Sequence, residues 1–381
     1  MNHLCRPSCP LRIGPIELDF PVVQAALSGY SDLPMRVTAR RLGVPYTLCE
    51  VMLDKFLVAL KPRRKNHHFL AVADEEHPVG GQLMGAEPAQ FGLAAQRLVE
   101  HGFDAIDINF GCPVKKVLGR CRGGFHLGQP AVALEIVSRV RDSVPASIPV
   151  TVKMRRGIDD TPESRDNFFE IFDGAYERGV AAITVHGRTV TQRYDGPSRW
   201  EFLRDLKRYA GQRVVLGSGD LFSARACLDM LAYTGVDGVT VARGAIGNPW
   251  IFGQARALAQ GLPLPLPPSL HEQRDVIAEH YRLAEETFGP VRCVPDMRKS
   301  AIKYSQLHPH HQQVRKDFCQ VKQAGAWREV LNKWYAADGP GVHPQITEPN
   351  PRSHDAIPPV GESCNPTRDQ QPAWAGAIAK G

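Results

Sequence analysis

The chain has 381 residues, of which 43% are apolar and 23% charged, and its formal net charge is +6. This balance excludes a wholly disordered or fibrous protein, because it provides ample material for a globular core. No run of about 18 apolar residues is present, so we expect no transmembrane helix and no membrane partner. The N-terminus lacks the apolar segment of a secretory signal.

Short apolar runs alternate with helical patterns between residues 16 and 260, after an irregular stretch at 1–15. Most runs are rich in Val or Ile and bounded by Gly, Pro or polar residues, which is typical of buried parallel strands. The predicted strands are 21–26, 46–51, 79–84, 105–110, 150–154, 182–186, 213–218 and 238–243.

Amphipathic patterns fill most of the gaps between these runs. The clearest predicted helices are 87–101, 130–142, 164–178 and 223–233, and Ser31-Asp32 before Leu33-Pro34 indicates another helix start. Eight strand–helix units of this length predict a (β/α)₈ TIM barrel. An open doubly wound sheet is the alternative, but no GxGxxG follows its first strand.

The composition and the hydrophobic pattern of the sequence change after the predicted barrel. Residues 262–268, LPLPLPP, form a proline-rich joint, and 269–335 have continuous helical patterns that predict a small helical bundle. From about Pro340 the chain is rich in Pro, Gly and polar residues, which favours a disordered tail. We therefore expect a barrel domain at 1–261, a helical domain at 269–338 and a tail at 340–381.

Polar residues end nearly every predicted strand of the barrel. Gln82, Asn109, Lys153 and His186 occupy such positions, and Ser28 follows the first strand. The chemistry of a TIM barrel lies at the C-terminal ends of its strands. Buried polar groups also need partners, so a whole set of them indicates a ligand, although any single one could be a cap.

The ends of the last two strands are rich in glycine. GSGD at 217–220 and ARGAIGNP at 242–249 indicate a phosphate site, to which Arg243 could add a charged contact. GSGD alone could equally be an ordinary tight turn. Phosphate at this end, with Lys153 and Gln82 reaching a heteroaromatic ring, fits FMN better than NAD.

Cys112 is the most informative of the nine cysteines, whose scatter along the chain favours free thiols in a reducing cytoplasm. It lies in a Gly-Cys-Pro turn directly after the fourth strand, where it could donate a proton or act as a nucleophile. Nearby cations would lower its pKa. Those cations are Lys115, Lys116, Arg120 and Arg122.

The other cysteines are weaker candidates. Cys121 is a rival on the same loop, whereas Cys49 and Cys227 have the sequence surroundings of core residues. Cys5 and Cys9 could suggest a metal, but no Cys or His cluster completes a four-ligand set, so we expect no metal site.

Basic residues gather in the predicted helical domain. Residues 292–333 hold nine cations against three acids, and KPRRKNHH at 61–68 adds a second run. The ordinary interpretation of such runs is a solvated helix face. Two basic segments beside a basic loop with a candidate thiol favour a nucleic acid partner.

These residues resemble the tRNA-dihydrouridine synthase family from about residue 20 to 335. The matching motifs are ALSGYSDLPMR, DINFGCPVKKV, VTVKMRRG, VHGRT, GSGDL and ARGAIGNPWIF. The resemblance implies an enzyme that uses FMN and NADPH to reduce the C5–C6 double bond of uridine in tRNA. The family usually has Pro-Met-Ala-Gly where this chain has Ala26-Leu27-Ser28-Gly29, and Asn at the position of Ser218.

The family's roles can be transferred to the matching positions. The resemblance implies that hydride from the flavin reaches C6 and that Cys112 protonates C5, while Asn109 orients the uracil. The implied FMN-binding residues are Ala26, Leu27, Ser28, Gln82, Lys153, His186, Ser218, Gly219, Asp220, Ala242 and Arg243. The cations expected to bind tRNA are Lys115, Lys116, Arg298, Lys299, Lys303, Arg315 and Lys316.

Two other functions stay open at this point. An FMN barrel that acts on a small molecule, of dihydroorotate or enoate type, explains the barrel but not the basic helical region. A non-catalytic RNA-binding protein would have no need for Cys112, Lys153 and His186 together. No obligate protein partner is evident, and a tRNA enzyme of this kind is expected in the cytoplasm.

Overall fold

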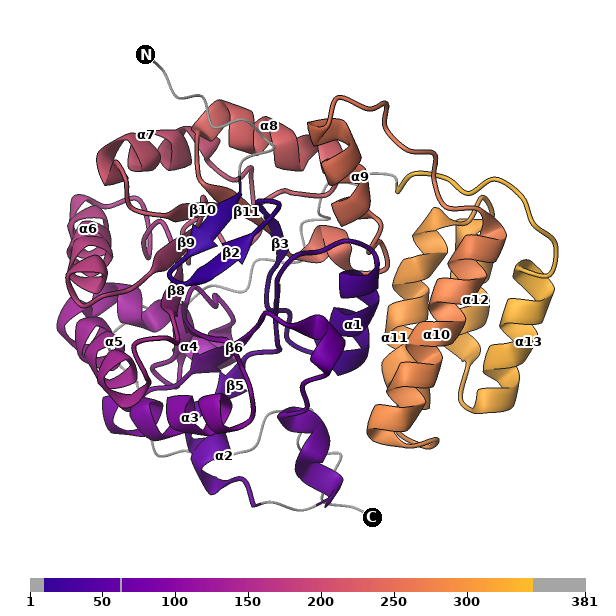
Figure 1. The fold of residues 1–381 in the computed structure, drawn as a ribbon, viewed down its shortest axis with the longest axis horizontal. Helices are drawn as coiled ribbons and strands as arrows, with labels where there is room; N and C mark the ends of the chain where they lie inside the picture. The colour runs from indigo at the N-terminus through magenta and orange to yellow at the C-terminus, as the bar shows by residue number, and fades with distance from the viewer. Residues whose placement is uncertain (1–9, 62–63, 345–381) are drawn as a thin grey trace.

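A computed structural model describes residues 10–61 and 64–344 of the chain. Its central feature is a closed barrel of eight parallel strands, with a helical bundle at one side (Figure 1). The pairings of β11 with β3 and of β4 with β6 close the ring. The predicted TIM barrel is therefore confirmed, and the open sheet is excluded.

All eight predicted strands are present, some of them shorter than the sequence indicated. They are β3 (Val22–Gln24), β4 (Thr47–Leu48), β6 (Val79–Met84), β7 (Ala105–Phe110), β8 (Val150–Arg155), β9 (Ala182–His186), β10 (Val215–Ser218) and β11 (Gly238–Val241). A further short strand, β5 (Met52–Leu53), pairs with the end of β6.

The helices around the barrel begin close to the predicted positions. Asp32 caps the first of them by accepting a hydrogen bond from the Met35 amide at 3.0 Å, and Pro34 lies in the first turn. The helices are α1 (Leu33–Arg41), α2 (Asp54–Ala59), α3 (Pro88–Glu100), α4 (Lys115–Leu118), α5 (Pro130–Ser143), α6 (Pro162–Glu177), α7 (Trp200–Ala210), α8 (Ala224–Thr234) and α9 (Ile251–Ala259). Short 3₁₀ helices are η1 (Arg64–Phe69), η2 (Asp74–Glu76), η3 (Gly123–Gly128) and η4 (Arg243–Ala245).

The N-terminal stretch differs from the irregular segment that the sequence suggested. Antiparallel β1 (Leu11–Ile13) and β2 (Ile16–Leu18) form a hairpin whose turn has Gly14 at φ +58°. Its buried leucines pack against Ala105, Ala182 and Leu216, which face the barrel interior near the strand starts. Strands of three residues are too short to show a clear alternation, which explains why the sequence pattern did not reveal them.

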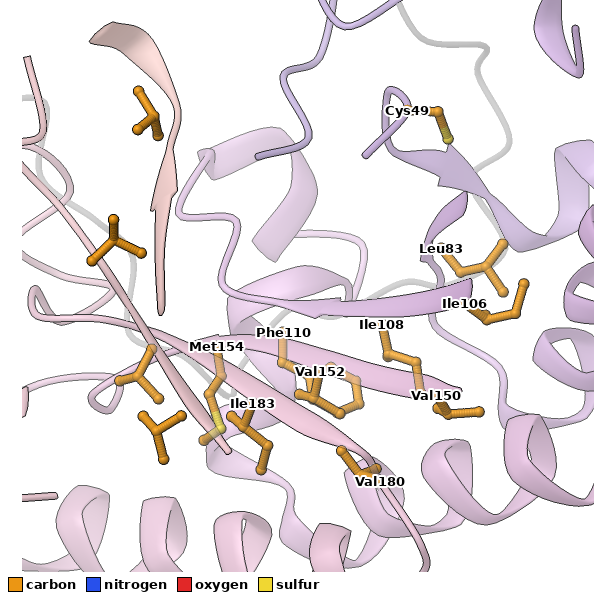
Figure 2. Close-up of a cluster of buried hydrophobic side chains, with 14 of the residues drawn as sticks. Cys49, Leu83, Ile106, Ile108, Phe110, Val150, Val152, Met154, Val180 and Ile183 are labelled. Carbon is orange, nitrogen blue, oxygen red and sulfur yellow. The ribbon is translucent and has the colours of Figure 1, made fainter. Parts of the chain in front are cut away.

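The main core lies between the outer face of the strands and the helices. Figure 2 shows Leu83, Ile108 and Val152 in this layer, all fully buried. Cys49 and Cys227 are buried in it, as expected for core residues, and burial raises the pKa of each thiol to about 12. Apolar residues therefore occupy the outward positions of the strands, which leaves the inward positions near the strand ends for polar groups.

Four α-helices follow the proline-rich joint, which itself contains no helix or strand. They are α10 (Leu270–Phe288), α11 (Cys293–Tyr304), α12 (His311–Gln320) and α13 (Ala324–Trp334), with the 3₁₀ helix η5 (Ser305–Leu307) after α11. They enclose a core of their own that includes Phe318 and Trp327, and they lie beside α1 and α9 (Figure 1).

Several predicted features fall partly or wholly outside the described residues. In the segment predicted as a disordered tail, Val342 donates a backbone hydrogen bond to Leu307 at 2.9 Å, and 345–381 lie outside the description. Cys5 and Cys9 also lie outside it, as do residues 62 and 63 of the KPRRKNHH run. Within the described part of the chain, no helix is long and apolar enough to cross a membrane.

Candidate active site

The strand register brings several predicted residues together on the inner face of the barrel. Residues at paired positions of parallel strands point to the same face of the sheet. Asn109 is paired with Lys153. Two residues further along, Arg155 is paired with His186, and His186 with Ser218. Four strands, β7 to β10, thus place polar groups around one opening at their C-terminal ends.

A buried hydrogen-bond network fixes the floor of this opening. The Asn109 amide donates to Gln82 Oε1 at 2.8 Å, and Gln82 Nε2 donates to Asp107 at 2.7 Å. The hydroxyl of Thr151 donates to the second oxygen of Asp107 at 2.6 Å. Burial raises the pKa of Asp107, while these donors and Lys153 act in the opposite direction. The network sets the orientation of the Gln82 and Asn109 amides.

Cys112 is held in a tight turn by backbone groups. The oxygen Oδ1 of Asn109 accepts hydrogen bonds from the amides of Gly111 at 2.9 Å and Cys112 at 3.1 Å. The Cys112 carbonyl accepts from Gly124 at 3.1 Å. A Cβ on Gly123, whose φ is +60°, would lie 2.8 Å from the Cys112 Cβ. Glycine is therefore required where the loop returns to the thiol.

The structure reverses the expected direction of the Cys112 pKa shift. Burial, the largest effect, raises this pKa above its ordinary value, although a backbone hydrogen bond from Val114 and the charges of Arg155 and Lys153 lower it. The pKa expected from the sequence took account of the cations of the loop but not of the desolvation of the thiol. A protonated thiol at neutral pH suits a proton donor better than a nucleophile.

Cys121, the other candidate on this loop, is not a free thiol. Cys121 is disulfide-bonded, at φ +56°, whereas Cys112 is a free cysteine. The expectation that the cysteines are free thiols is therefore wrong for Cys121.

Lys153 and His186 lie in a strongly cationic environment. Burial, followed by the charge of Arg155, lowers the pKa of Lys153 to about 8. Burial also lowers the pKa of His186 well below its ordinary value, and neighbouring cations act in the same direction. The Nδ1 of neutral His186 accepts a hydrogen bond from the Arg188 amide at 3.1 Å, so its proton is on Nε2, where it can be donated to a ligand.

The glycine-rich loop after β10 is shaped by Asp220, which has φ +61°. Its carboxylate accepts hydrogen bonds from the Ser198 amide at 2.7 Å and from Arg188 at 2.9 Å, and lies 3.7 Å from Arg243. The side chain of Asp220 is thus engaged within the protein. Gly219 has φ +118°, and a Cβ there would lie 2.7 Å from the Ser198 Cβ, so only glycine fits.

An aromatic residue that sequence reasoning missed stands at the rim of this opening. The ring of Tyr194 is 44% exposed and lies between the guanidinium groups of Arg155, 5.6 Å away, and Arg243, 4.6 Å away. Arg155 also donates to the Gly111 carbonyl beside the thiol at 2.9 Å. Tyr194 follows β9 within a polar loop, and only its position after a strand end could have indicated a role.

The remaining predicted residues have varied surroundings. Ala26 and Leu27 are half-buried and Ser28 is exposed, directly after β3. Among the predicted tRNA-binding cations, Lys116, Lys303, Arg315 and Lys316 are exposed, whereas Lys115 and Arg298 are half-buried. Lys299 is engaged within the protein, with its ammonium 3.1 Å from Asp296 and 5.6 Å from the centre of the Tyr30 ring.

A surface pocket of about 620 Å³ lies between the start of α7 and α8. Trp200, Glu201 and Tyr233 line it, and Asp220 is the one predicted site residue among its lining residues. This pocket is therefore distinct from the opening that contains Cys112, Lys153 and His186.

Comparison with known proteins identifies the family of the chain. Residues 23–336 match the family model described as dihydrouridine synthase. A probable tRNA-dihydrouridine synthase of Mycobacterium tuberculosis (strain CDC 1551 / Oshkosh) is 36% identical over 326 residues, covering 83% of this chain and 82% of that protein. The tRNA-dihydrouridine synthase B of Xanthomonas axonopodis pv. citri is 32% identical, covering 89% and 99%.

Solved structures support the fold. Histamine dehydrogenase from Rhizobium sp. 4-9 superposes with a TM-score of 0.53 at 14% identity, over 74% of this chain and 51% of that one. The family match and the curated relatives support the resemblance seen in the sequence and not a small-molecule oxidoreductase. The chain belongs to the dihydrouridine synthase family.

Proposed function

We propose that this protein is an FMN-dependent tRNA-dihydrouridine synthase that takes its electrons from NADPH. Family membership makes it an oxidoreductase that acts on uridines of tRNA. The observation that carries the proposal is the half-buried free thiol of Cys112, held in a backbone turn after β7 with Lys153 and Arg155 as its charged neighbours. We assign the chemistry to the barrel, 1–261, and tRNA binding mainly to the helical domain, 269–338. A tRNA substrate favours the cytoplasm as the compartment.

The inner face of the barrel fits FMN in charge and in hydrogen-bond capacity. Lys153 has no hydrogen-bond or ion-pair partner among the described residues, and His186 has its Nε2 proton to donate. The hydroxyl of Thr240, paired in register with Ser218, is buried without a partner in the described structure. Arg243 adds a positive charge near the glycine-rich loop. A flavin with an anionic phosphate would satisfy these groups.

Three polar residues would hold the flavin in this proposal. Lys153 would place a positive charge beside the ring, and its pKa of about 8 keeps it mostly charged at neutral pH. His186 would donate from Nε2. Gln82, whose orientation is set by Asp107, would offer its second amide hydrogen. The backbone of Ser218, Gly219, Asp220, Ala242 and Arg243 would hold the phosphate end, and Ala26, Leu27 and Ser28 would line the opposite loop.

FMN, when bound, would supply hydride chemistry at C6 of the uracil ring. Cys112 would then donate its thiol proton to C5. Because burial raises the pKa of the thiol, Cys112 keeps this proton before the transfer. Asn109 uses both lone pairs of Oδ1 to hold the Cys112 turn, which leaves one amide hydrogen to orient the uracil. Tyr194, exposed between two arginines, can cover the extruded base or its phosphate.

The target base is normally stacked in folded tRNA and must be extruded to reach this depth. Phosphate contacts would orient the tRNA without reading its sequence. Lys115 and Lys116 lie on α4, directly after the Cys112 turn, while Arg315 and Lys316 lie exposed on α12. Arg298 and Lys303 lie on α11, the α-helix that precedes α12 in the chain.

The direct test is purification of the full chain followed by release and identification of its chromophore. The proposal predicts FMN at close to one equivalent and NADPH oxidation that depends on it. Failure to bind FMN after reconstitution, or binding of a different flavin only, would refute the proposed cofactor.

A further inference from the structure

Helix α11 reaches the barrel loop that follows β3. Its Lys299 ammonium lies 5.6 Å from the centre of the Tyr30 ring, a cation–π distance. Tyr30 is three residues beyond Leu27, in the loop proposed above to line the flavin. One contact between the helical bundle and the proposed flavin loops is therefore made by a lysine side chain over an aromatic ring.

The end of the same helix contacts the loop that follows β11. Gly247 has φ +69°, and a Cβ there would lie 2.5 Å from the Tyr304 amide nitrogen, so the two backbones meet without space for a side chain. Just after the helix, Gln306 donates to the Ile246 carbonyl at 3.1 Å. This loop begins at Ala242 and Arg243, the proposed phosphate-binding residues. One helix thus contacts both ends of the proposed flavin site.

The loop that carries Tyr30 is closed on itself by hydrogen bonds. The Leu27 carbonyl accepts hydrogen bonds from the amides of Tyr30 and Ser31, both at 2.9 Å. The Ser31 hydroxyl accepts from the Leu27 amide at 2.8 Å, and the Ser31 carbonyl accepts from the amide of Glu50 at 3.1 Å. These hydrogen bonds couple the position of Tyr30 to that of Leu27.

The charge of Lys299 is neutralised by acids of the protein itself. Its ammonium lies 3.1 Å from Asp296 on the same helix. Burial, followed by the Asp32 carboxylate, raises the pKa of Glu50 to about 7, and the charge of Lys299 acts against this rise. Lys299 opposes the raised pKa of Asp32 in the same way. By contrast, the side chain of Lys303, one turn further along α11, is exposed.

We propose that α11 is a structural link between the tRNA-binding helices and the two flavin loops, and that Lys299 is a positioning residue in this link, in contact with Tyr30 and not with a tRNA phosphate. This inference rests on the proposed function. By linkage, tRNA that shifts α11 changes the affinity for FMN, and FMN changes the affinity for tRNA by the same factor.

Two lysines on one helix provide a matched test. In Lys299→Met, hydrogen exchange at the amides of Tyr30 and Ser31 should accelerate, and FMN affinity should fall about 2- to 30-fold, the range expected from a lost cation–π contact. The dependence of tRNA affinity on salt should not change. In Lys303→Met, the plot of log tRNA affinity against log salt concentration should become less steep by about 0.7–0.9, and hydrogen exchange at Tyr30 and Ser31 should not change.

Two further variants keep the test decisive. Lys299→Arg retains the cation over the ring and should restore slow exchange, whereas Tyr30→Leu removes the same contact from the barrel side and should reproduce Lys299→Met. The proposal is overturned if Lys299→Met lowers the salt slope and leaves exchange unchanged, or alters neither. Hydrogen exchange and tRNA binding are also measured without FMN. If the wild-type protein bound no flavin, the proposed function would be refuted, but these two measurements would still test the structural link through α11.

Discussion

Replacing Cys112 with alanine isolates the proton-transfer step, because backbone groups hold its turn. The hydrogen bonds from Gly111 and Cys112 to Asn109, and from Gly124 to the Cys112 carbonyl, all survive the substitution. A positioned general acid contributes about 10²–10⁴-fold to a rate. At about 1.36 kcal/mol per tenfold change, this corresponds to roughly 2.7–5.5 kcal/mol of lost transition-state stabilisation.

The assay separates the two half-reactions of the Cys112→Ala variant. Dihydrouridine is quantified by nucleoside mass spectrometry after a single turnover with reduced enzyme, and NADPH oxidation is followed without tRNA. The tRNA reaction should fall by the stated factor, while NADPH oxidation stays within about twofold. Cys319→Ala, which removes an exposed thiol on α12, and Cys121→Ala should do far less. Equal losses in both half-reactions would refute the assigned role.

The pH dependence of the same reaction follows from the direction of the Cys112 shift. Burial raises its pKa above 9.0, so the acid form that donates the proton persists through neutral pH and is lost as pH rises through that raised value. The single-turnover rate should show no thiol titration between about pH 6 and 8 and should decline only in more alkaline solution. A decline that depends on Cys112 and is centred near pH 7 would contradict the proton-donor assignment.

Three other substitutions test the cofactor and tRNA sites. Gly219→Ala should weaken FMN binding roughly 5- to 150-fold in titrations, since a Cβ there would lie 2.7 Å from the Ser198 Cβ and strain at φ +118° costs about 1–3 kcal/mol within the loop proposed to hold the phosphate. Gly235→Ala also places alanine at positive φ, +70°, but at the end of α8 and with open space around its Cβ, so it controls for backbone strain and should leave FMN binding unchanged. Lys153→Met should weaken FMN binding roughly 10- to 150-fold, because a hydrogen bond to a charged group contributes about 1.5–3 kcal/mol; an unchanged affinity would remove Lys153 from the site. Reversing Arg315 and Lys316 to Glu should weaken tRNA binding most at low salt and leave the flavin spectrum unchanged. If the variant bound tRNA as tightly as the wild-type protein at every salt concentration, these cations would only solvate a helix face.

The barrel is predictable from the sequence because its strands are buried on both sides and alternate regularly with helices. The polar ends at Gln82, Asn109, Lys153 and His186 contrast with the apolar runs that precede them, and this contrast in residue type is enough to indicate a site. The β1–β2 hairpin is not predictable in this way because each strand has three residues, too few for a period to show.

Other features depend on contacts that no local pattern encodes. The pKa of Cys112 is set by burial from neighbouring loops, which outweighs the cations nearby in the sequence. Tyr194 becomes notable only because Arg155 and Arg243, which are far apart in the chain, meet its ring. Lys299 has the sequence surroundings of one more cation in a basic run, and only the fold brings it against Tyr30.

The central claim is that this barrel reduces uridine in tRNA through Cys112. The most direct measurement is mass spectrometry of nucleosides from unmodified tRNA after incubation with the purified protein, FMN and NADPH, with Cys112→Ala in parallel. We expect dihydrouridine with the wild-type protein and at most about a hundredth of that initial rate with the variant. Absence of dihydrouridine with the flavin-loaded wild-type protein, or equal rates for the two proteins, would contradict it.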